Sequence, residues 1–305
     1  MAEVLRVTVF GGSGFIGRHL VQRLVRQGDM VTVVARHDAP FLKPMGDVGQ
    51  VVQQLGNLAD TGLLQRAVAG ADAVVNLIGI LAESGGQRFD AVQHLGAERI
   101  ARAAAAAGVA RFVQISAIGA DPASPSRYAR SKARGEAAVL AAFPAATILR
   151  PSIVFGPEDL FFNRFAAMAE TWGVLPLIGG GATRFQPVYV GDVADAVRQV
   201  LGRPDTAGRI YELGGPEIRT FRALLELMLR VIGRPKTRLV PLPFAVAGIL
   251  ALFAQYAPGA PLTPDQVVLL RVDNVVGHAA LALRDLGLAP TAMAQILPGY
   301  LSRKR

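Results

Sequence analysis

The chain has 305 residues, of which 51% are hydrophobic and 18% charged, and its formal net charge at pH 7 is +9. This composition indicates a globular protein, long enough for one large α/β unit or for a cofactor domain with a smaller lobe. The absence of cysteine excludes disulfides, thiolate metal sites and a cysteine nucleophile, and no metal site is expected. Basic residues are not interleaved with aromatic ones, so nucleic-acid binding is not expected either. The first residues enter a β-like segment without a signal peptide, which favours a cytoplasmic location.

Strand-like and helix-like segments alternate through the first half of the chain. The strands are expected at Val4–Phe10, Met30–Ala35, Val51–Leu55, Ala73–Ile78, Arg111–Ser116 and Thr147–Leu149. The helices are expected at Phe15–Gln27, Gly62–Ala69, Phe89–Ala107 and Tyr128–Ala142. Short apolar strands separated by helices predict an α/β fold with a doubly wound parallel (Rossmann) sheet, formed by residues 1–150.

After Arg150, prolines and glycines separate shorter elements. We expect a strand near Gln186–Val190, a helix near Asp192–Leu201 and another near Phe221–Ile232, for which Thr220 is a plausible N-cap. Residues 151–305 are therefore expected to form a smaller C-terminal lobe that is interleaved with the sheet.

The segment Leu239–Ala257 is the most apolar stretch of the chain. Its prolines and glycine limit the helical part to roughly 14 residues, which is short for a membrane span. A buried or partner-facing helix and a helix lying on a membrane surface both remain open. The basic tail Ser302–Arg305 would suit an anionic cytoplasmic membrane face, although a solvated terminus accounts for it equally well.

A glycine-rich turn, Gly11-Gly12-Ser13-Gly14-Phe15-Ile16-Gly17, follows the first strand and opens a helix. Gly11 permits the tight turn, Gly14 allows the backbone to approach a pyrophosphate, and Gly17 allows close helix packing. The N–H groups at the start of the helix can then bind the phosphates. The turn therefore predicts a dinucleotide site that includes all seven residues.

The end of the second strand distinguishes between the two nicotinamide cofactors. Sites for NAD(H) place a carboxylate there to bind the ribose, but this chain has Ala35 followed by Arg36. Arg36 can pair with a 2′-phosphate, and Arg18 can approach from the helix. We therefore favour NADP(H), with NADPH bound, over NAD(H). Asn57 and Leu58 are weaker candidates for the adenine site, and Leu77 and Gly79 for the strand end that the cofactor passes.

Tyr128 and Lys132 lie one helical turn apart and share a face. The lysine can lower the pKa of the phenol and hold the nicotinamide ribose, while the tyrosine transfers a proton to or from a substrate oxygen. Their position after the fifth strand predicts a catalytic pair.

With these motifs, the chain resembles the extended and atypical short-chain dehydrogenases, including the segment Leu149–Pro157 after the sixth strand, which contains Pro151. A closer resemblance, over roughly residues 6 to 290, is to the dehydrogenase-like accessory subunits of respiratory complex I and their bacterial relatives. The most specific matching segment is Pro44–Gln50. This resemblance implies bound NADPH, contacts from Gly11, Gly14, Gly17, Arg18, Arg36, Tyr128 and Lys132, and a mainly structural or regulatory role.

One departure from active dehydrogenases concerns the serine that orients the substrate carbonyl. Aligned with active epimerases, Ala117 occupies its place, and Ser116 lies one residue earlier and faces the other way if the strand continues. We therefore expect cofactor binding with slow or absent turnover.

Three functions remain open. The first is an NADP(H)-binding accessory subunit of complex I, peripheral on the cytoplasmic face of the inner membrane. The second is an active oxidoreductase or epimerase on a small carbonyl or sugar-nucleotide substrate, with Tyr128 as general acid, Lys132 as its partner and Ser116 as orienting residue. The third is a soluble redox-sensing regulator.

Overall fold

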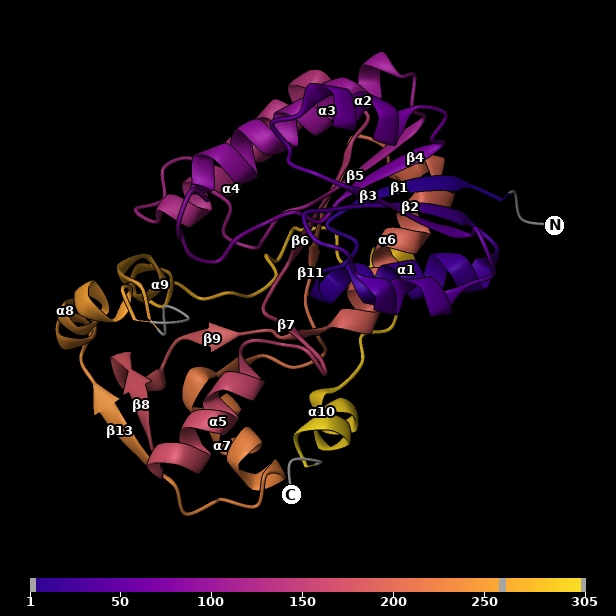
Figure 1. Ribbon diagram of the computed structural model, residues 1–305. Coiled ribbons are helices and arrows are strands. Elements are labelled where there is room, and N and C mark those ends of the chain that lie inside the picture. Colours follow the sequence, from indigo (N-terminus) through magenta and orange to yellow (C-terminus); the bar gives the residue numbers. More distant parts are fainter. Residues whose placement is uncertain (1–3, 258–261, 303–305) are drawn as a thin grey trace.

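The computed structural model describes residues 4–257 and 262–302, and its centre is a seven-stranded parallel sheet (Figure 1). The strand order is β11-β6-β5-β4-β1-β2-β3. The strands are β1 (Arg6–Phe10), β2 (Met30–Ala35), β3 (Val51–Leu55), β4 (Ala73–Asn76), β5 (Arg111–Ile115), β6 (Thr147–Pro151) and β11 (Ile210–Leu213). The chain order reverses at β1, which confirms the predicted doubly wound fold.

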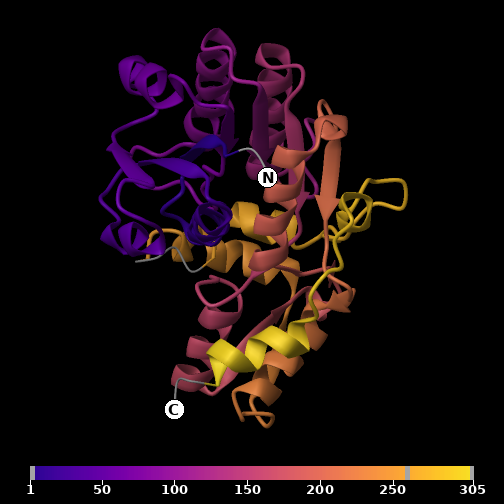
Figure 2. The ribbon, with the colours of Figure 1, turned by 90° about the vertical axis from the view of Figure 1, so that its right-hand side faces the viewer.

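Helices cover both faces of this sheet because successive strand residues point to opposite sides. Val9 packs with α1 (Phe15–Gln27) and α6 (Val190–Gly202) on one face. The next residue, Phe10, packs on the other face with α2 (Thr61–Val68), α3 (Gly96–Ala106) and α4 (Arg127–Ala142). The rotated view in Figure 2 shows α6 against the sheet of the upper lobe. Both layers together bury the strands and hold their carboxyl ends in place.

The second half of the chain contributes to both lobes, since β11 and α6 complete the first lobe. The small lobe contains α5 (Phe162–Trp172), α7 (Phe221–Val231), α10 (Met293–Leu301) and the parallel pair β8 (Val174–Ile178) and β13 (Arg238–Leu242). Two short pairs join it to the sheet: β7 (Val154–Phe155) with β10 (Val188–Tyr189), and β9 (Arg184–Phe185) with β12 (Arg219–Thr220). The Thr220 hydroxyl accepts a hydrogen bond from the Ala223 amide at 3.2 Å, which confirms the predicted N-cap.

The apolar stretch Leu239–Ala257 divides into two elements. Its first residues form β13, and α8 (Phe244–Ala254) follows and packs against α9 (Pro264–Leu269). Within α8 only Ala247 and Ala251 are buried, so of the open alternatives the buried core helix does not apply. A partner-facing helix and a membrane-surface helix stay predictions. Among residues 4–257 and 262–302, no helix has the length and apolar character needed to cross a bilayer.

Smaller differences from the predicted elements have local causes. The helix expected at Phe89–Ala107 begins as a π-helix, Asp90–Leu95, where Gly135 of α4 lies so close that a side chain would overlap the carbonyl of Gln93.

The tail residues 303–305 lie outside the described residues. Short 3-10 turns occur at Pro40–Met45, Gly179–Gly181, Pro204–Thr206 and Leu283–Leu286.

Candidate cofactor-binding site

The glycine turn lies at the carboxyl end of β1 and has the geometry of a phosphate-binding turn. Gly11 has a φ of +81°, a left-handed conformation that disfavours other residues. A Cβ on Gly17 would lie 2.4 Å from the Gly11 carbonyl oxygen, so only glycine allows α1 to approach this closely. Gly12 is less tightly restricted, because its Cβ would lie 2.9 Å from the Val33 side chain and not against backbone.

The N-terminus of α1 is free to bind an anion. Its N-cap, Gly14, provides no side-chain cap, and the first turn contains no acidic residue. The first amides of an α-helix have no partner within the helix, so those of Phe15, Ile16 and Gly17 can donate to phosphate oxygens. Ser13 precedes them in the turn. The structure thus brings all seven predicted residues of this turn together.

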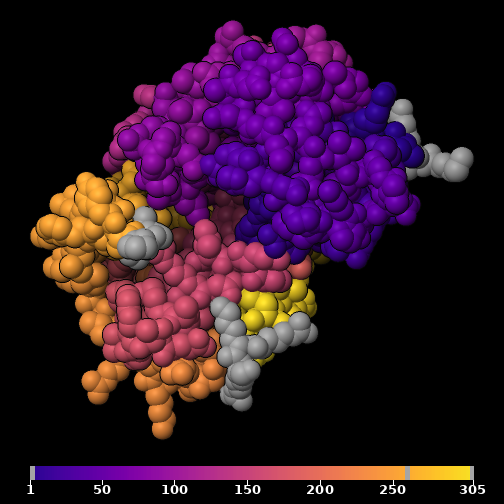
Figure 3. Space-filling view, viewed as in Figure 1, coloured from indigo at the N-terminus to yellow at the C-terminus, as the bar shows by residue number. Residues whose placement is uncertain are grey.

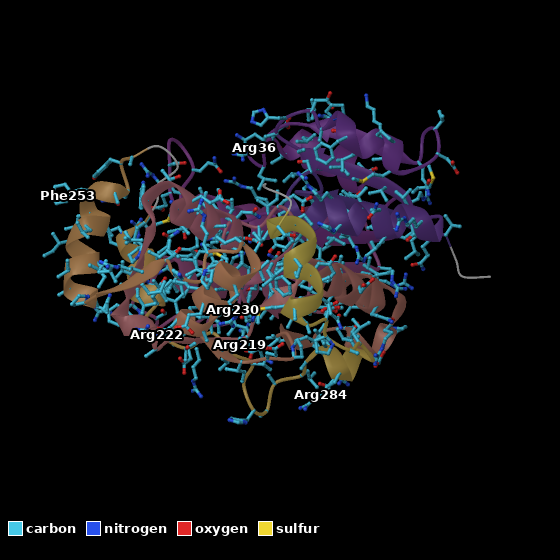
Figure 4. All side chains as sticks on the ribbon, turned by 90° about the horizontal axis from the view of Figure 1, so that it is seen from below. Arg36, Arg219, Arg222, Arg230, Phe253 and Arg284 are labelled. Atoms are coloured by element: carbon cyan, nitrogen blue, oxygen red, sulfur yellow. The ribbon has the colours of Figure 1, made fainter. Side chains whose placement is uncertain are left out.

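The two arginines predicted to select NADP(H) have different surroundings. Arg18 lies between the lobes, with Nη1 3.3 Å from Glu158 Oε1 and its guanidinium 4.7 Å from the centre of the Phe41 ring. The buried Nε of Arg18 has no hydrogen-bond partner among the described residues. Arg36 directly follows β2 and is exposed, as Figure 4 shows, and within the described residues it forms no ion pair. Both side chains retain donors for a phosphate group.

Some of the weaker candidates for cofactor contacts have structural roles, and others lie at the site. The Asn57 side chain accepts a hydrogen bond from the Ala59 amide at 3.1 Å, which forms the turn before α2, and Leu58 packs against the second core. Leu77 donates its amide to the Phe10 carbonyl at 2.9 Å and so keeps the strand end beside the glycine turn. Pro151 is buried at the carboxyl end of β6.

Tyr128 and Lys132 project from α4, as the sequence predicts. The Lys132 Nζ lies 5.9 Å from the centre of the Tyr128 ring and donates to the Ile115 carbonyl at 3.4 Å. A Cβ on Gly79 would lie 3.1 Å from the same Nζ, so the small residue after β4 leaves space for the lysine. The structure therefore brings Gly79, Lys132 and Tyr128 to the carboxyl ends of β4 and β5.

Burial changes the acid–base properties of this pair. It lowers the pKa of Lys132 to about 8, although the nearby Glu136 carboxylate favours the charged form. It also raises the pKa of Tyr128 to about 12. Desolvation thus moves the pKa of Tyr128 in the direction opposite to the lowering expected from the lysine.

The position of Ser116 is consistent with an incomplete active site. Its amide donates to the Leu149 carbonyl at 2.7 Å, so the β5 backbone alignment continues through this residue. Its buried hydroxyl has no hydrogen-bond partner in the described part of the chain, and therefore none in Tyr128 or Lys132.

The structure also identifies Gln93, which the sequence analysis missed. Its Nε2 donates to the Ser131 hydroxyl at 3.0 Å, and its buried Oε1 would lie 3.5 Å from a Cβ on Gly79. The pattern of the chain contains no indication of this residue, because its position depends on the π-helix and on Gly135. π-Helical turns are frequent at functional sites.

Three buried side-chain atoms lack a hydrogen-bond partner within the described residues: Arg18 Nε, Gln93 Oε1 and Ser116 Oγ. Buried polar atoms in native proteins are nearly always paired, so each exception requires an explanation. Arg18 follows the glycine turn, and the other two lie beside Lys132 and its acceptor Ile115. One of these atoms lies next to the phosphate-binding turn and the other two lie near Lys132, where a polar ligand could pair with them.

The comparisons with known proteins agree with this geometry. Residues 7–214 match the NAD dependent epimerase/dehydratase family. The chain is 41% identical over 297 residues to the mitochondrial NADH dehydrogenase [ubiquinone] 1 alpha subcomplex subunit 9 of Arabidopsis thaliana, covering 93% of this chain and 74% of the relative. It is 34% identical to the mitochondrial NADH-ubiquinone oxidoreductase 40 kDa subunit of Neurospora crassa, covering 98% of this chain and 79% of that protein.

Among solved structures, the dTDP-glucose 4,6-dehydratase DesIV of Streptomyces venezuelae, crystallised with NAD, superimposes with a TM-score of 0.73. The two are 25% identical, and the match covers 97% of this chain and 96% of the dehydratase. Both lobes are thus shared. The chain belongs to the NAD dependent epimerase/dehydratase family, and within it to the group that contains the alpha subcomplex subunit 9 proteins.

Proposed function

We propose that this protein holds NADPH as a bound ligand and acts as an accessory subunit of respiratory complex I, on the cytoplasmic face of the membrane. The observation that carries the proposal is the contrast within the site: a complete phosphate-binding turn and a serine hydroxyl that contacts neither Tyr128 nor Lys132. The similarity to two subunits of this respiratory enzyme over more than nine-tenths of the chain supports the choice of partner.

Each part of the dinucleotide has residues that fit it. The turn at Gly11–Gly17 would bind the pyrophosphate, Arg18 and Arg36 the 2′-phosphate, and Tyr128 with Lys132 the nicotinamide ribose. NADPH would supply a hydride to a substrate, but the Ser116 hydroxyl contacts neither Tyr128 nor Lys132, so we expect productive placement of a carbonyl to be inefficient.

The test of this function is affinity purification of the tagged protein from native membranes solubilised in mild detergent. We expect core subunits of complex I to co-purify, together with NADPH that resists exchange. A protein recovered without any complex I subunit would overturn the proposal.

The surface of α8 supports a peripheral position on the membrane. Phe253 is 74% exposed and Ile249 is 59% exposed, although both are apolar. In Figure 3 this orange region protrudes at the left edge, and Figure 4 shows Phe253 at its outer side. The exposed apolar residues are Val246, Ile249, Leu250, Leu252, Phe253 and Tyr256, and we call them the α8 face. Exposed apolar side chains gathered on one short segment are typical of an interaction site.

The chain segment that leads into α8 is basic, and its charge favours an anionic bilayer as the partner of the α8 face. Between Glu226 and Asp265 the sequence contains no acidic residue. Within the described residues, the basic side chains of this interval form no ion pair, and all are exposed: Arg230, Arg234, Lys236 and Arg238. Each basic residue near an anionic membrane contributes about 1 kcal/mol. The α8 face would enter the interface while these side chains bind lipid phosphates.

Co-sedimentation with vesicles tests this contact. We expect binding to vesicles of mixed phosphatidylserine and phosphatidylcholine, and about tenfold weaker binding by Phe253→Glu. The control is Val48→Glu, which introduces the same charge at a fully exposed residue of the other lobe and should bind like the wild type. Equal binding by both variants, or binding to complex I in detergent with none to vesicles, would count against a lipid partner.

The geometry of Tyr128 and Lys132 favours one alternative, an active oxidoreductase or epimerase on a small carbonyl or sugar-nucleotide substrate. In this case Tyr128 would act as general acid and Ser116 would have to reorient toward the substrate. NADPH oxidation by carbonyl compounds that is abolished by Tyr128→Phe would establish the alternative. Absence of turnover across such compounds supports the accessory role.

A further inference from the structure

The helix that carries Tyr128 is capped by a residue from the distant C-terminal half of the chain. The Asp265 carboxylate accepts hydrogen bonds from the Arg127 amide at 2.7 Å, from the Tyr128 amide at 3.0 Å and from the Ser126 hydroxyl at 2.8 Å. Ser126 in turn accepts from the Ala129 amide at 3.2 Å. The first turn of α4 is thus held by one local cap and by one carboxylate from α9.

This arrangement exceeds the needs of an ordinary helix end. A single N-cap such as Ser126 satisfies one or two of the free amides, and its hydroxyl is fully buried here. Asp265 adds a negative charge at the positive end of the α4 dipole, which is a favourable position. One of its hydrogen bonds is to the backbone of Tyr128 itself, so the carboxylate constrains the residue whose phenol lies at the site.

The helix that carries Asp265 has its own cap and its own packing contact. α9 begins with a capping box, in which the Thr263 hydroxyl and the Gln266 side chain each bond to the other's backbone amide at 3.2 and 3.1 Å. Val267 of α9 packs with Ala247 and Ala251 of α8. In Figure 1, α9 lies below the left-hand end of α4, with α8 on its outer side. The carboxylate is therefore fixed by the same small unit that carries the α8 face.

We propose that Asp265 is a positioning residue for the nicotinamide end of the cofactor site, acting through the backbone of Tyr128. The proposal rests on the proposed binding of NADPH. Loss of the carboxylate frees the first turn of α4, and the Tyr128 phenol is then held less firmly against the nicotinamide ribose. The phosphate-binding turn, at the carboxyl end of β1, keeps its geometry.

Calorimetric titration of NADPH and of adenosine 2′,5′-bisphosphate, which lacks the nicotinamide ribose, tests this division. We expect Asp265→Ala to weaken NADPH binding about fivefold and to leave the bisphosphate within about twofold. Asp265→Asn keeps an acceptor oxygen and should restore part of the affinity. Thr220→Ala, which removes the cap of α7, controls for a general loss of stability and should change neither ligand.

A double-mutant cycle with Tyr128→Phe decides whether Asp265 acts through the phenol. If it does, Asp265→Ala changes NADPH affinity less than about twofold in the Tyr128→Phe background, because coupled residues are not additive. An undiminished fivefold loss in that background, or equal losses for both ligands, would overturn the inference and leave the proposed function intact. Undetectable NADPH binding by the wild type would overturn both.

Discussion

The two ends of the cofactor site differ in how completely they are built. At the phosphate end, a glycine turn, a free helix N-terminus and two arginines with available donors are all in place. At the nicotinamide end, Tyr128 and Lys132 are present, but the Ser116 hydroxyl is buried and unpaired. Binding of a dinucleotide and reaction of its nicotinamide are separate requirements, and we propose that this chain meets the first more fully than the second.

The largest effect is expected from Gly17→Ala at the phosphate end. The new methyl group would lie 2.4 Å from the Gly11 oxygen and 2.5 Å from the Gly12 oxygen, so backbone must move. We expect a loss of about 3 kcal/mol in stability and a loss of NADPH affinity of at least about a hundredfold. Denaturant unfolding and calorimetric titration measure the two effects. Gly202→Ala is the control, because a Cβ on Gly202 has open space around it. Wild-type NADPH affinity in Gly17→Ala would show that the turn at Gly11–Gly17 does not bind the pyrophosphate.

At the nicotinamide end of the site, Lys132→Met should raise the free energy of unfolding of the cofactor-free protein. Burial lowers the pKa of Lys132 from 10.5 to about 8, so the native state disfavours the proton that the unfolded chain retains. The cost is present in full below about pH 8 and disappears as the pH rises toward 10.5. We expect a gain of up to about 3 kcal/mol at neutral pH, which shrinks across this window.

Denaturant unfolding of the cofactor-free wild type and Lys132→Met, measured from about pH 7 to about pH 10, follows the difference in their free energies of unfolding across the pKa range of Lys132. The high pKa of Tyr128 affects both proteins alike and cancels in the comparison. A destabilised Lys132→Met, or a difference that does not change with pH, would show that the lysine is not held at an energetic cost.

Arg36→Ala is expected to have a smaller effect, which changes the affinity for NADPH but not for NADH. Removal of one guanidinium should weaken NADPH binding about tenfold and leave NADH binding unchanged, since only NADPH has the 2′-phosphate. Arg26→Ala removes an exposed positive charge at the other end of α1 and controls for general electrostatics. If both cofactors lose affinity equally, Arg36 does not read the 2′-phosphate.

The phosphate end could be predicted from the sequence because its requirements are local. Gly11 and Gly17 are needed within one turn, and the bounds of α1 follow from the periodicity that begins at Phe15. Gln93 and Asp265 could not be predicted. The position of the first depends on a π-helix whose backbone lies against Gly135, and the second caps a helix 137 residues away in sequence. The strand β13, within the apolar stretch, could not be predicted either, because it forms by pairing with β8, which lies far away in the sequence.

We propose that NADPH is held in this site without efficient turnover. The most direct measurement is the absorbance of reduced nicotinamide in the purified complex, followed after addition of a panel of small carbonyl and sugar-nucleotide substrates. The account predicts that the bound NADPH stays reduced with every compound, in the wild type and in Tyr128→Phe alike. Rapid oxidation in the wild type that is lost in Tyr128→Phe would contradict it.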